Sequence, residues 1–374
     1  MLPFTRPTVD EETIQGVAEV LRSGWLASGP KVAELEAALS RYLGGRPVRT
    51  QTSATASMEM ALLACGIGAG DEVITPAMSF VATANVIMRA WARPVFVDVG
   101  LDSRNIDLEQ VEAAITPRTR AILPVHFAGL PVNMDRLYDI AKRHGLRVIE
   151  DAAHAIGSAW KGRRIGSFGD LVCFSFHPNK NMTTIEGGAV SGGSAEEIKA
   201  LELHRWHGQV KIPGGVETLF AGGKANLSDV AARVGLGQLA RLEEFNARRR
   251  QIVARYFSLW SKPPVRLPER GVDGDTEGHS WHVFTPLLPL EQLKITRPQF
   301  IEAMAERGIA VGVHYPAIHL FTAYRALGYR EGQFPNAERI GRETVTLPLF
   351  PAMELSDVDR VVEAVNEIIT GARA

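Results

Sequence analysis

Short apolar segments alternate with amphipathic segments between about residue 50 and residue 205, and this alternation constrains the fold more than any other feature. The predicted strands are DEVITP, RPVFVDV, RAILPVHF, LRVIED and DLVCFSF, and helical patterns separate most of them. One such helix starts in SATASMEM and carries Ala54, Met58, Ala61 and Leu62 on one face. The pattern predicts an α/β fold in which a largely parallel sheet is covered by helices on both faces.

A different pattern follows this α/β region. Residues 227–260 predict a long helical region with Ser228 as its N-cap. Residues 261–280 are rich in Pro, Gly and Asp and predict a loop that leads into a second domain. We therefore expect a large domain over residues 1–250 and a smaller one over residues 251–374.

The smaller domain has the mixed pattern of an α+β unit. In order, the sequence predicts a strand, a helix, a second strand and a closing helix at residues 281–288, 297–308, 309–315 and about 356–370. Upstream of this domain, residues 208–225 show no clear period. Disorder, a lid over a site and an arm that contacts a second subunit all remain open for that segment.

Composition and charge argue against several classes of protein. The formal net charge is −1, so we expect no general attraction to nucleic acid or to an anionic membrane. No apolar run reaches the roughly 18 residues of a membrane span, and the N-terminal residues lack a signal-peptide pattern, so we expect a cytoplasmic protein. The two cysteines cannot form a disulfide framework, and no Cys/His cluster has zinc spacing. The glycine run GIGAG precedes a predicted strand, which argues against a dinucleotide site.

Polar side chains gather at the ends of the predicted strands, where open α/β sheets bind their ligands. Taken singly, each has an ordinary structural role, because Ser and Thr cap helices, Asp does the same after a strand, and Lys is solvated. Together they combine an anion site at a helix N-terminus, a carboxylate at a strand end and an amine on the following loop. These residues are Ser53, Thr55, Asp151, Ser175, His177 and Lys180.

This combination of groups suits pyridoxal 5'-phosphate (PLP). Its phosphate needs N–H groups and hydroxyls, and its ring nitrogen needs a buried carboxylate to stay protonated. Its aldehyde needs a lysine for a Schiff-base linkage, and its ring face needs an aromatic side chain. Gly187 and Gly188, which follow Lys180, are expected to let the backbone pass close to the cofactor at positive φ; a plain hairpin turn is the alternative.

Four long motifs follow one another along the chain. They are TSATASMEMALLACGIGAGDEVITPAMSFVATANVI, RTRAILPVHFAGLPVNMDRLYDIAKRHGLRVIEDAAHAIGS, GSFGDLVCFSFHPNKNMTTIEGGAV and GVHYPAIHL. With flanking segments they cover nearly the whole chain, which resembles the DegT/DnrJ/EryC1/StrS family of sugar aminotransferases. The resemblance implies the aspartate-aminotransferase-like fold type I of PLP enzymes, with a mostly parallel seven-stranded sheet between helices and a smaller α+β C-terminal domain.

The resemblance assigns roles to the residues that match the family motifs. Lys180 would form the Schiff base and then move a proton at the substrate carbon, and Asp151 would pair with the ring nitrogen. His314, Tyr315 and His319 would lie where the small domain approaches the substrate. The other cofactor contacts would be Ala54, Thr55 and Ser175 at the phosphate, Phe80 on the ring face, His154 near the ring oxygen, and Asn226 at the phosphate of the neighbouring subunit. This last contact implies a homodimer with shared active sites.

The implied reaction is a ping-pong transamination from L-glutamate to a nucleotide-linked 4-keto sugar, with UDP as the expected nucleotide. The SAT, DAAHA and FSFHPNKN motifs are most similar to enzymes that make UDP-4-amino-4-deoxy-L-arabinose for lipid A, or that act on a UDP-4-keto-hexose in pseudaminic-acid synthesis. We therefore expect a role in lipopolysaccharide or other surface polysaccharide biosynthesis. Neither nucleic acid nor a membrane is an expected partner, and no metal is expected.

Two alternatives and two departures from the family pattern qualify this interpretation. A pyridoxamine-dependent sugar dehydratase would carry histidine in place of Lys180, and a non-catalytic PLP-binding regulator would need a DNA-binding segment or a basic run, which the sequence lacks.

Many members of the family have SGT where this chain has Ser53–Thr55, so Ala54 must have negative φ. Many also have N-Y-R-M at 226–229, where this chain has NLSD and lacks an aromatic and an arginine contact.

Overall fold

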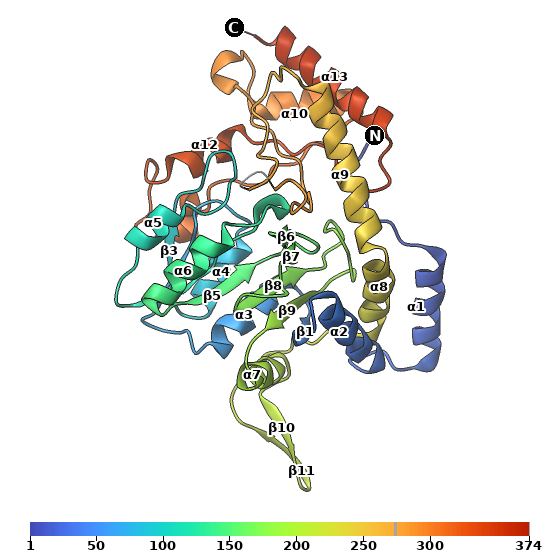
Figure 1. Ribbon diagram of the computed structural model, residues 1–374, viewed down its shortest axis with the longest axis vertical. Coiled ribbons are helices and arrows are strands. Elements are labelled where there is room, and N and C mark those ends of the chain that lie inside the picture. Colours follow the sequence, from blue (N-terminus) through green and yellow to red (C-terminus); the bar gives the residue numbers. More distant parts are fainter. Residues whose placement is uncertain (273–274, 374) are drawn as a thin grey trace.

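The computed structural model describes residues 1–272 and 275–373 and consists of a central sheet with helices packed around it (Figure 1). Residues 273–274 of the expected 261–280 loop, and residue 374, lie outside this description. The strands are β1 Val48–Gln51, β2 Glu72–Pro76, β3 Arg93–Val97, β4 Thr119–Ile122, β5 Arg147–Asp151, β6 Ala159–Trp160, β7 Arg163–Arg164, β8 Leu171–Ser175, β9 Gly188–Gly192, β10 Gln209–Ile212 and β11 Gly215–Thr218.

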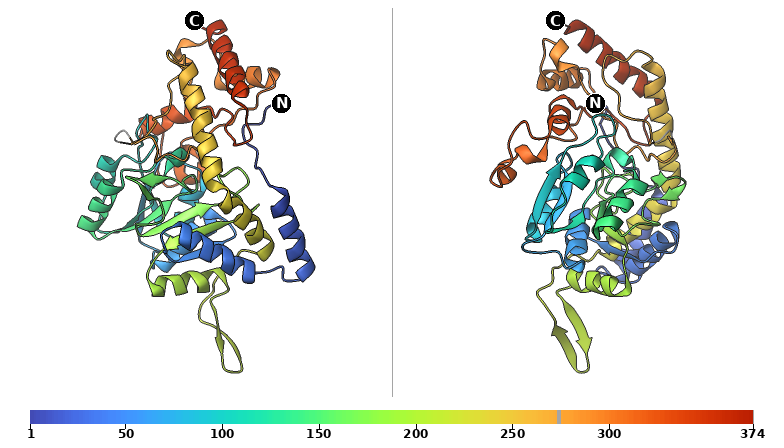
Figure 2. Two further views of the ribbon diagram at one scale, coloured as in Figure 1. Left: turned by 45° about the vertical axis from the view of Figure 1, so that its right-hand side comes forward. Right: turned by 60° about the vertical axis from the view of Figure 1, so that its left-hand side comes forward.

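The helices occupy both faces of the sheet and the end of the molecule that carries the C-terminus (Figures 1 and 2). The first group is α1 Glu11–Ser23, α2 Pro30–Tyr42, α3 Ala54–Ala64, α4 Ala82–Arg89, α5 Leu108–Ala113, α6 Met134–His144, α7 Ala195–Arg205, α8 Asp229–Ala240 and α9 Leu242–Leu259. The second is α10 Arg297–Glu306, α11 Thr322–Arg325, α12 Pro335–Glu343 and α13 Leu355–Gly371, with short 3₁₀ turns η1 Phe127–Gly129, η2 Leu290–Gln292 and η3 Ile318–Leu320.

The main sheet of the described chain has seven strands in the order β1-β9-β8-β5-β4-β2-β3. Strands β3, β2, β4, β5 and β8 pair in parallel, whereas β9 is antiparallel to both β8 and β1. Alternate residues of β8 enter two different cores, Val172 and Phe174 on one face and Leu171 and Cys173 on the other. The largely parallel sheet expected from the alternating pattern is confirmed, and most residues of its strands are buried because both faces are covered.

The predicted long helical region forms two helices. Ser228 is the N-cap of α8, and its side chain accepts a hydrogen bond from the amide of Ala231, as predicted. Arg241, with φ −107° and ψ 2°, separates α8 from α9. Asp229, the first residue of α8, also accepts hydrogen bonds from the amides of Gly29 and Val32 and so caps α2 from outside that helix.

The predicted strands 281–288 and 309–315 are not continuous strands in the described structure. They form only single bridges, among them Phe284 with Leu347 and Gly312 with Thr346. Segment 281–288 is buried and segment 309–315 is partly buried, and Trp281, Phe284, Leu288 and Ile309 enter a core built with α9, α10 and α13. Their β-rich composition therefore reflects burial in an irregular layer, where packing outweighs strand propensity.

A separate hydrophobic core supports our proposal of a large domain over 1–250 and a small domain over 251–374. This core takes its members from the second half of α9 and from the chain beyond it. The first residues of the chain depart from the division, because Leu2 bridges Ile309 and packs against the same core. We propose that the boundary lies within α9, which runs from one region to the other (Figure 1).

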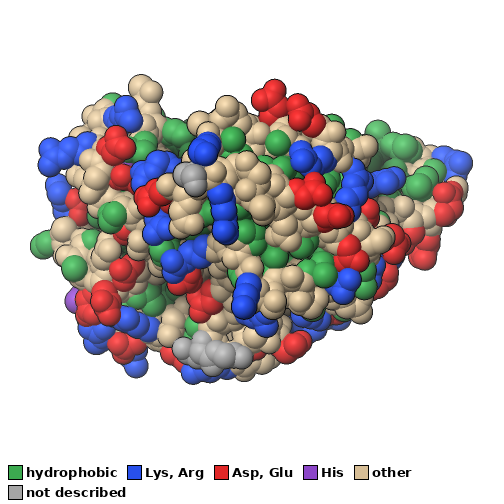
Figure 3. Space-filling view, turned by 90° about the horizontal axis from the view of Figure 1, so that it is seen from above, with side chains coloured by type: hydrophobic (Ala, Val, Ile, Leu, Met, Phe, Trp, Pro, Cys, Tyr) green, Lys and Arg blue, Asp and Glu red, His purple; other side chains and the backbone are tan. Residues whose placement is uncertain are grey.

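The segment that showed no period, 208–225, contains the hairpin β10–β11, which projects away from the body of the protein (Figure 2). Both strands are largely exposed, and they carry the exposed apolar side chains Ile212 and Val216. Seen from the end that carries the C-terminus, acidic and basic side chains are interspersed (Figure 3), in keeping with the near-zero net charge. None of the described helices is long and apolar enough to cross a membrane.

Candidate active site

A cavity of about 350 Å³ opens where β5 and β8 end beside the N-terminus of α3. Ligands bind at this edge in open α/β sheets. The cavity brings together most of the side chains that the sequence singled out, although they come from distant parts of the chain. The predicted residues that line it are Ser53, Ala54, Thr55, Phe80, Asp151, His154, Ser175, His177, Lys180, His314 and Tyr315.

The first turn of α3 forms an anion-binding end of this cavity. Ser53 is the N-cap, and its side chain accepts a hydrogen bond of 3.1 Å from the amide of Ala56. Ala54 is not among the residues with positive φ, so alanine stands there without strain. Within the described residues, the amides of Ala54 and Thr55 have no hydrogen-bond acceptor. They are therefore free to bind the oxygens of a phosphate.

Gly188 is required by close packing and not by its backbone angles. Neither Gly187 nor Gly188 has positive φ, which corrects the prediction from the sequence. A Cβ atom on Gly188 would lie 2.4 Å from the carbonyl carbon of Ser53 and 2.5 Å from the amide nitrogen of Ala54. Strand β9 therefore approaches the first turn of α3 so closely that only glycine fits.

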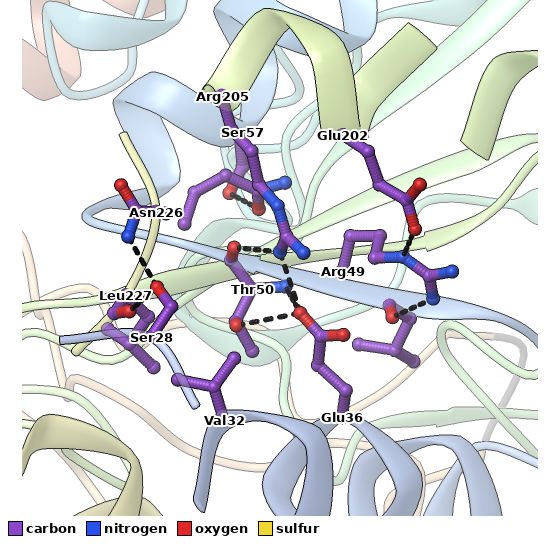
Figure 4. A network of polar contacts seen from close by, with 12 residues as sticks. Ser28, Val32, Glu36, Arg49, Thr50, Ser57, Glu202, Arg205, Asn226 and Leu227 are labelled. Carbon is purple, nitrogen blue, oxygen red and sulfur yellow. Dashed lines mark hydrogen bonds and ion pairs between the residues drawn. The ribbon is translucent and has the colours of Figure 1, made fainter. Parts of the chain in front are cut away.

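A polar network beneath this turn holds β1 in place (Figure 4). Glu36 of α2 accepts hydrogen bonds from the amide of Thr50 at 2.8 Å and from Arg205 of α7 at 2.7 Å. One residue further along β1, the side-chain oxygen of Gln51 accepts a bond from Ser57, and its buried amide nitrogen has no partner. The network fixes the strand that leads into the Ser53 turn.

Asp151, the last residue of β5, is buried and held by two hydrogen bonds. Thr83 of α4 donates to Oδ2 at 2.8 Å, and the amide of Ala153 donates to Oδ1 at 3.1 Å. Burial raises the pKa of Asp151, while these bonds and the charge of Lys180 oppose that effect. A carboxylate held in this way is suited to pair with a cationic ring nitrogen.

Lys180 lines the cavity and is half-buried. Burial lowers the pKa of Lys180 to about 8, and the negative charge of Asp151 acts in the opposite direction. A lysine with this pKa exists partly as the free amine near neutral pH, which is the form that attacks a carbonyl carbon.

An aromatic wall closes one side of the cavity. The Tyr315 hydroxyl lies 3.3 Å from Nε2 of His154, and the Tyr315 ring lies 5.7 Å from the ring of Phe80. Nδ1 of His154 accepts a hydrogen bond from the amide of Ala128, so the proton of the neutral ring is on Nε2. Burial and the charge of Lys180 lower the pKa of His154, which keeps the ring neutral. His154 is therefore a donor toward the cavity side.

Two predicted residues do not line the cavity of their own chain. His319 is fully buried and bonds Glu338 at 3.0 Å, so its side chain is committed to the interior, and its contact with a substrate stays a prediction. Asn226 lies outside the cavity, where its amide donates to Ser28 (Figure 4) and its oxygen accepts from Lys224. Its assignment to the site of a second subunit stays a prediction.

Sequence reasoning missed three residues next to the predicted ones. Ser79 and Thr83 are buried, and Thr83 orients Asp151; a signal was present, because both are hydroxyl residues in the segment SFVATANVIMRAW, which follows a predicted strand. His282 lies 3.5 Å from the amine of Lys180. The sequence indicated His282 only as a single histidine in the apolar run WHVFTPLL, and a histidine in such a run is more often a packing residue.

The chemistry of these groups fits PLP. The free amides at the start of α3 and the hydroxyls of Thr55 and Ser175 suit a phosphate, and the buried Asp151 suits a protonated ring nitrogen. Lys180 supplies the amine, and Phe80 presents an exposed ring at the cavity. No group of acidic, histidine or cysteine side chains in the described chain is arranged to hold a metal ion.

Comparisons with known proteins agree with this chemistry. The DegT/DnrJ/EryC1/StrS aminotransferase family matches residues 7–366. The chain is 39% identical to the spore coat polysaccharide biosynthesis protein SpsC of Bacillus subtilis, covering 99% of this chain and 98% of SpsC. The putative sugar aminotransferase Spr1654 of Streptococcus pneumoniae, in its PMP form, superposes with a TM-score of 0.94 at 32% identity, covering 99% of this chain and 100% of that one. PseC of Helicobacter pylori, an aminotransferase of pseudoaminic acid biosynthesis, gives a TM-score of 0.92 at 28% identity, with 99% of each chain covered.

Fold and site together define a PLP-dependent enzyme of fold type I, and Spr1654 has also been solved in a PLP form. The chain belongs to the DegT/DnrJ/EryC1/StrS aminotransferase family and is a PLP-dependent sugar aminotransferase. The dehydratase and regulator alternatives are therefore not supported.

Proposed function

We propose that the protein transfers an amino group from L-glutamate to a nucleotide-linked 4-keto sugar, with UDP as the nucleotide, in the synthesis of a surface polysaccharide or of lipid A. The observation that carries the proposal is that Lys180, Asp151 and the first turn of α3 all border one cavity. The similarity to SpsC, a spore coat polysaccharide protein, and to PseC supports a sugar acceptor and a surface product.

The chain's own residues divide the work as follows. When bound, PLP supplies an electron-withdrawing ring that stores the amino group between the two half-reactions. Lys180 would attach the cofactor and, when it is not attached, would take the proton from the substrate carbon and return it at the C4′ atom of the cofactor; its lowered pKa suits both directions. Asp151 pairs with the ring nitrogen, and Thr83 holds its carboxylate in orientation.

The remaining side chains position and enclose the reactants. The amides of Ala54 and Thr55, with the hydroxyl of Ser175, hold the phosphate, and Phe80 covers the ring face. His154 is a neutral donor for the ring oxygen. On the substrate side, the rings His314 and Tyr315 form the small-domain wall of the cavity and are both uncharged at neutral pH, because burial lowers the pKa of His314 to about 4 and raises that of Tyr315.

An assay with purified protein, PLP, L-glutamate and a panel of UDP-, dTDP- and GDP-linked 4-keto sugars tests the proposal. We expect 2-oxoglutarate and an amino sugar to form in equal amounts, with UDP-linked sugars turned over fastest. L-Aspartate and L-alanine serve as control donors, and Lys180→Ala as the inactive control. Turnover by Lys180→Ala, or a deoxygenated product without an amino group, would refute the assignment.

We further propose a homodimer in which Asn226 reaches the phosphate in the partner's site. Exposed apolar side chains on the projecting hairpin, such as Val216, favour association of two chains. Subunits of Lys180→Ala and Asn226→Ala, each inactive alone, test this when they are mixed after mild dissociation. Half of the dimers in a 1:1 mixture are hybrids with one intact site, so about a quarter of wild-type activity should return. No recovery would place Asn226 in the site of its own chain or outside both.

A further inference from the structure

Nζ of Lys180 has one hydrogen-bond partner within the described residues, and that partner is not an acid. It is Nε2 of His282, at 3.5 Å. This is a long contact, but such bonds are often long in ligand-free sites and shorten when the reactants bind. His282 is buried and belongs to the segment 281–288, which enters from the small-domain side of the chain. No role for His282 follows from cofactor or substrate contact, because it does not line the cavity.

The orientation of neighbouring amides fixes the tautomer of His282. The amide nitrogen of Asn181 donates to the carbonyl of Ser280 at 2.9 Å and to Oδ1 of Asn246 at 2.8 Å. A carbonyl oxygen only accepts, so Oδ1 of Asn181 must face His282, and it does so at 3.2 Å from Nδ1. Nδ1 of His282 therefore carries the proton, and the lone pair of Nε2 faces Lys180.

The surroundings hold His282 neutral and immobile. Arg249 is buried and donates to the carbonyls of both Trp281 and His282, at 3.3 and 3.0 Å. The His154 ring lies 4.3 Å away, between centroids. Burial is the largest cause that lowers the pKa of His282, and the positive charges of Lys180 and Arg249 act in the same direction. The ring is thus an acceptor and not an acid at neutral pH.

We infer that His282 is a positioning residue for the amine of Lys180. Its Nε2 lone pair accepts one N–H of Lys180 and so directs the rest of the amine into the cavity whenever Lys180 is not attached to the cofactor. The inference rests on the role proposed for Lys180. A series of hydrogen bonds runs from Asn246 through Asn181 and His282 to Lys180. It gives the flexible lysine side chain one preferred rotamer and so lowers the conformational entropy that is lost when the proton-transfer geometry forms.

The acceptor also influences the charge of Lys180. The groups that face Lys180 are Asp151, whose charge favours the ammonium, and the three neutral histidines His154, His282 and His314. A hydrogen bond from the ammonium to Nε2 stabilises the charged form and opposes the burial that lowers the pKa of Lys180. Loss of the acceptor should therefore lower that pKa further.

The test compares His282→Gln, whose amide oxygen can accept at the Nε2 position, with His282→Leu, which keeps the volume and removes the acceptor. The measurement is the pH dependence of reductive methylation of Lys180 by ¹³C-formaldehyde in the full-length, cofactor-free chain, followed on the peptide that contains Lys180. We expect a pKa near 8 for the wild type, the same value for His282→Gln, and a value lower by about one unit for His282→Leu. His279→Asn, at a buried histidine that accepts from the amide of Trp281, is the matched control and should leave the pKa of Lys180 unchanged.

A second readout uses the loaded enzyme. His282→Leu should lower kcat at unchanged KM for L-glutamate, and His282→Gln should restore most of the loss. Unchanged titration of Lys180 in His282→Leu, or equal shifts in the Leu and Gln variants, would overturn the inference. If His282→Leu does not fold, His282→Phe replaces it. Failure of the proposed function itself would appear separately, as turnover by Lys180→Ala.

Discussion

The hydroxyl of Thr83 lies 2.8 Å from Oδ2 of Asp151 and ties helix α4 to the end of strand β5. The same hydroxyl lies 2.8 Å from that of Ser79, which can donate to it and leave its proton for Asp151. Both partners are buried, so the bond is not shared with solvent. It orients the carboxylate on which the assignment of the ring-nitrogen contact depends.

Thr83→Val should therefore weaken cofactor binding without unfolding the protein, because valine keeps the shape and removes the donor. Loss of the bond leaves Oδ2 of Asp151 underpaired and raises the pKa of Asp151 further above its usual range. We expect PLP affinity to fall about tenfold, as for the loss of one hydrogen bond to a charged group. Equilibrium dialysis of PLP measures it, and Thr83→Ser, which keeps the hydroxyl, is the control. Equal affinities for the Val and Ser variants would contradict the orienting role.

Gly188→Ala should damage the anion-binding turn. The added Cβ would lie 2.4–2.6 Å from backbone atoms of Ser53 and Ala54, which cannot move away as a side-chain tip could. We expect the free energy of unfolding to fall by about 2–3 kcal/mol and inorganic phosphate, used as a competitor of PLP, to bind more weakly. Gly215→Ala in the hairpin is the matched control, since a Cβ there meets nothing within 4 Å. Equal stability of the two variants would show that β9 can shift.

Buried neutral histidines should make the protein acid-sensitive. Burial lowers the pKa of His279 to about 3 and that of His314 to about 4, whereas an unfolded histidine titrates near about 6.5. As the pH falls below about 6.5, the unfolded chain binds protons that the folded chain does not, so stability is full above that pH and decreases below it. Each such histidine adds a slope that approaches about 1.4 kcal/mol per pH unit.

Urea unfolding at pH 7, 6 and 5 measures this slope. His279→Asn should flatten it by about one proton's contribution, because Asn can still accept the bond of 3.0 Å from the amide of Trp281 but does not titrate. The residual slope would come from His314, His154 and His282, whose pKa values are also lowered. If the stability of His279→Asn depended on pH as steeply as that of the wild type, His279 would be protonated in the folded protein as well as in the unfolded chain.

Local signals predicted the parts of the fold that depend on local chemistry. The N-caps Ser53 and Ser228 stand where the sequence placed them, since caps act within one turn. Strand ends predicted the cavity, because parallel strands bring their carboxyl ends to one edge. The residue roles came from the resemblance to a family, and periodicity alone would not have supplied them.

Features that depend on contacts between distant segments were not predictable in this way. The strand-like runs that carry Phe284 and Gly312 form only single bridges, because packing against α9 and α13 decides their conformation. Gly188 is glycine because of a backbone 134 residues earlier in the chain, at Ala54. His319 faces Glu338 instead of the cavity, and His282 approaches Lys180, through folding that no motif spacing encodes.

The contact between Glu36 and Arg205 tests whether the polar network beneath the first turn of α3 supports the active site (Figure 4). The Arg205 guanidinium and the Glu36 carboxylate are 15% and 14% exposed, and the same carboxylate oxygen also accepts from the amide and hydroxyl of Thr50. Glu36→Ala should lower the free energy of unfolding by about 3 kcal/mol, because it leaves the amide of Thr50 without its acceptor and Arg205 with only the carbonyl of Thr50 to bond, in a largely buried place.

The matched control is Glu59→Ala, which removes the partner of Arg89, a side chain that is 64% exposed. That change should cost less than about 1 kcal/mol. A Glu36→Ala, Arg205→Ala cycle separates the pair from the Thr50 bonds: most of the loss should persist in the double variant if Thr50 is the main beneficiary. Since β1 runs directly into the Ser53 turn, Glu36→Ala should also weaken PLP binding, whereas Glu59→Ala should not. Loss of stability without loss of PLP affinity would show that the turn is held by α3 and β9 alone.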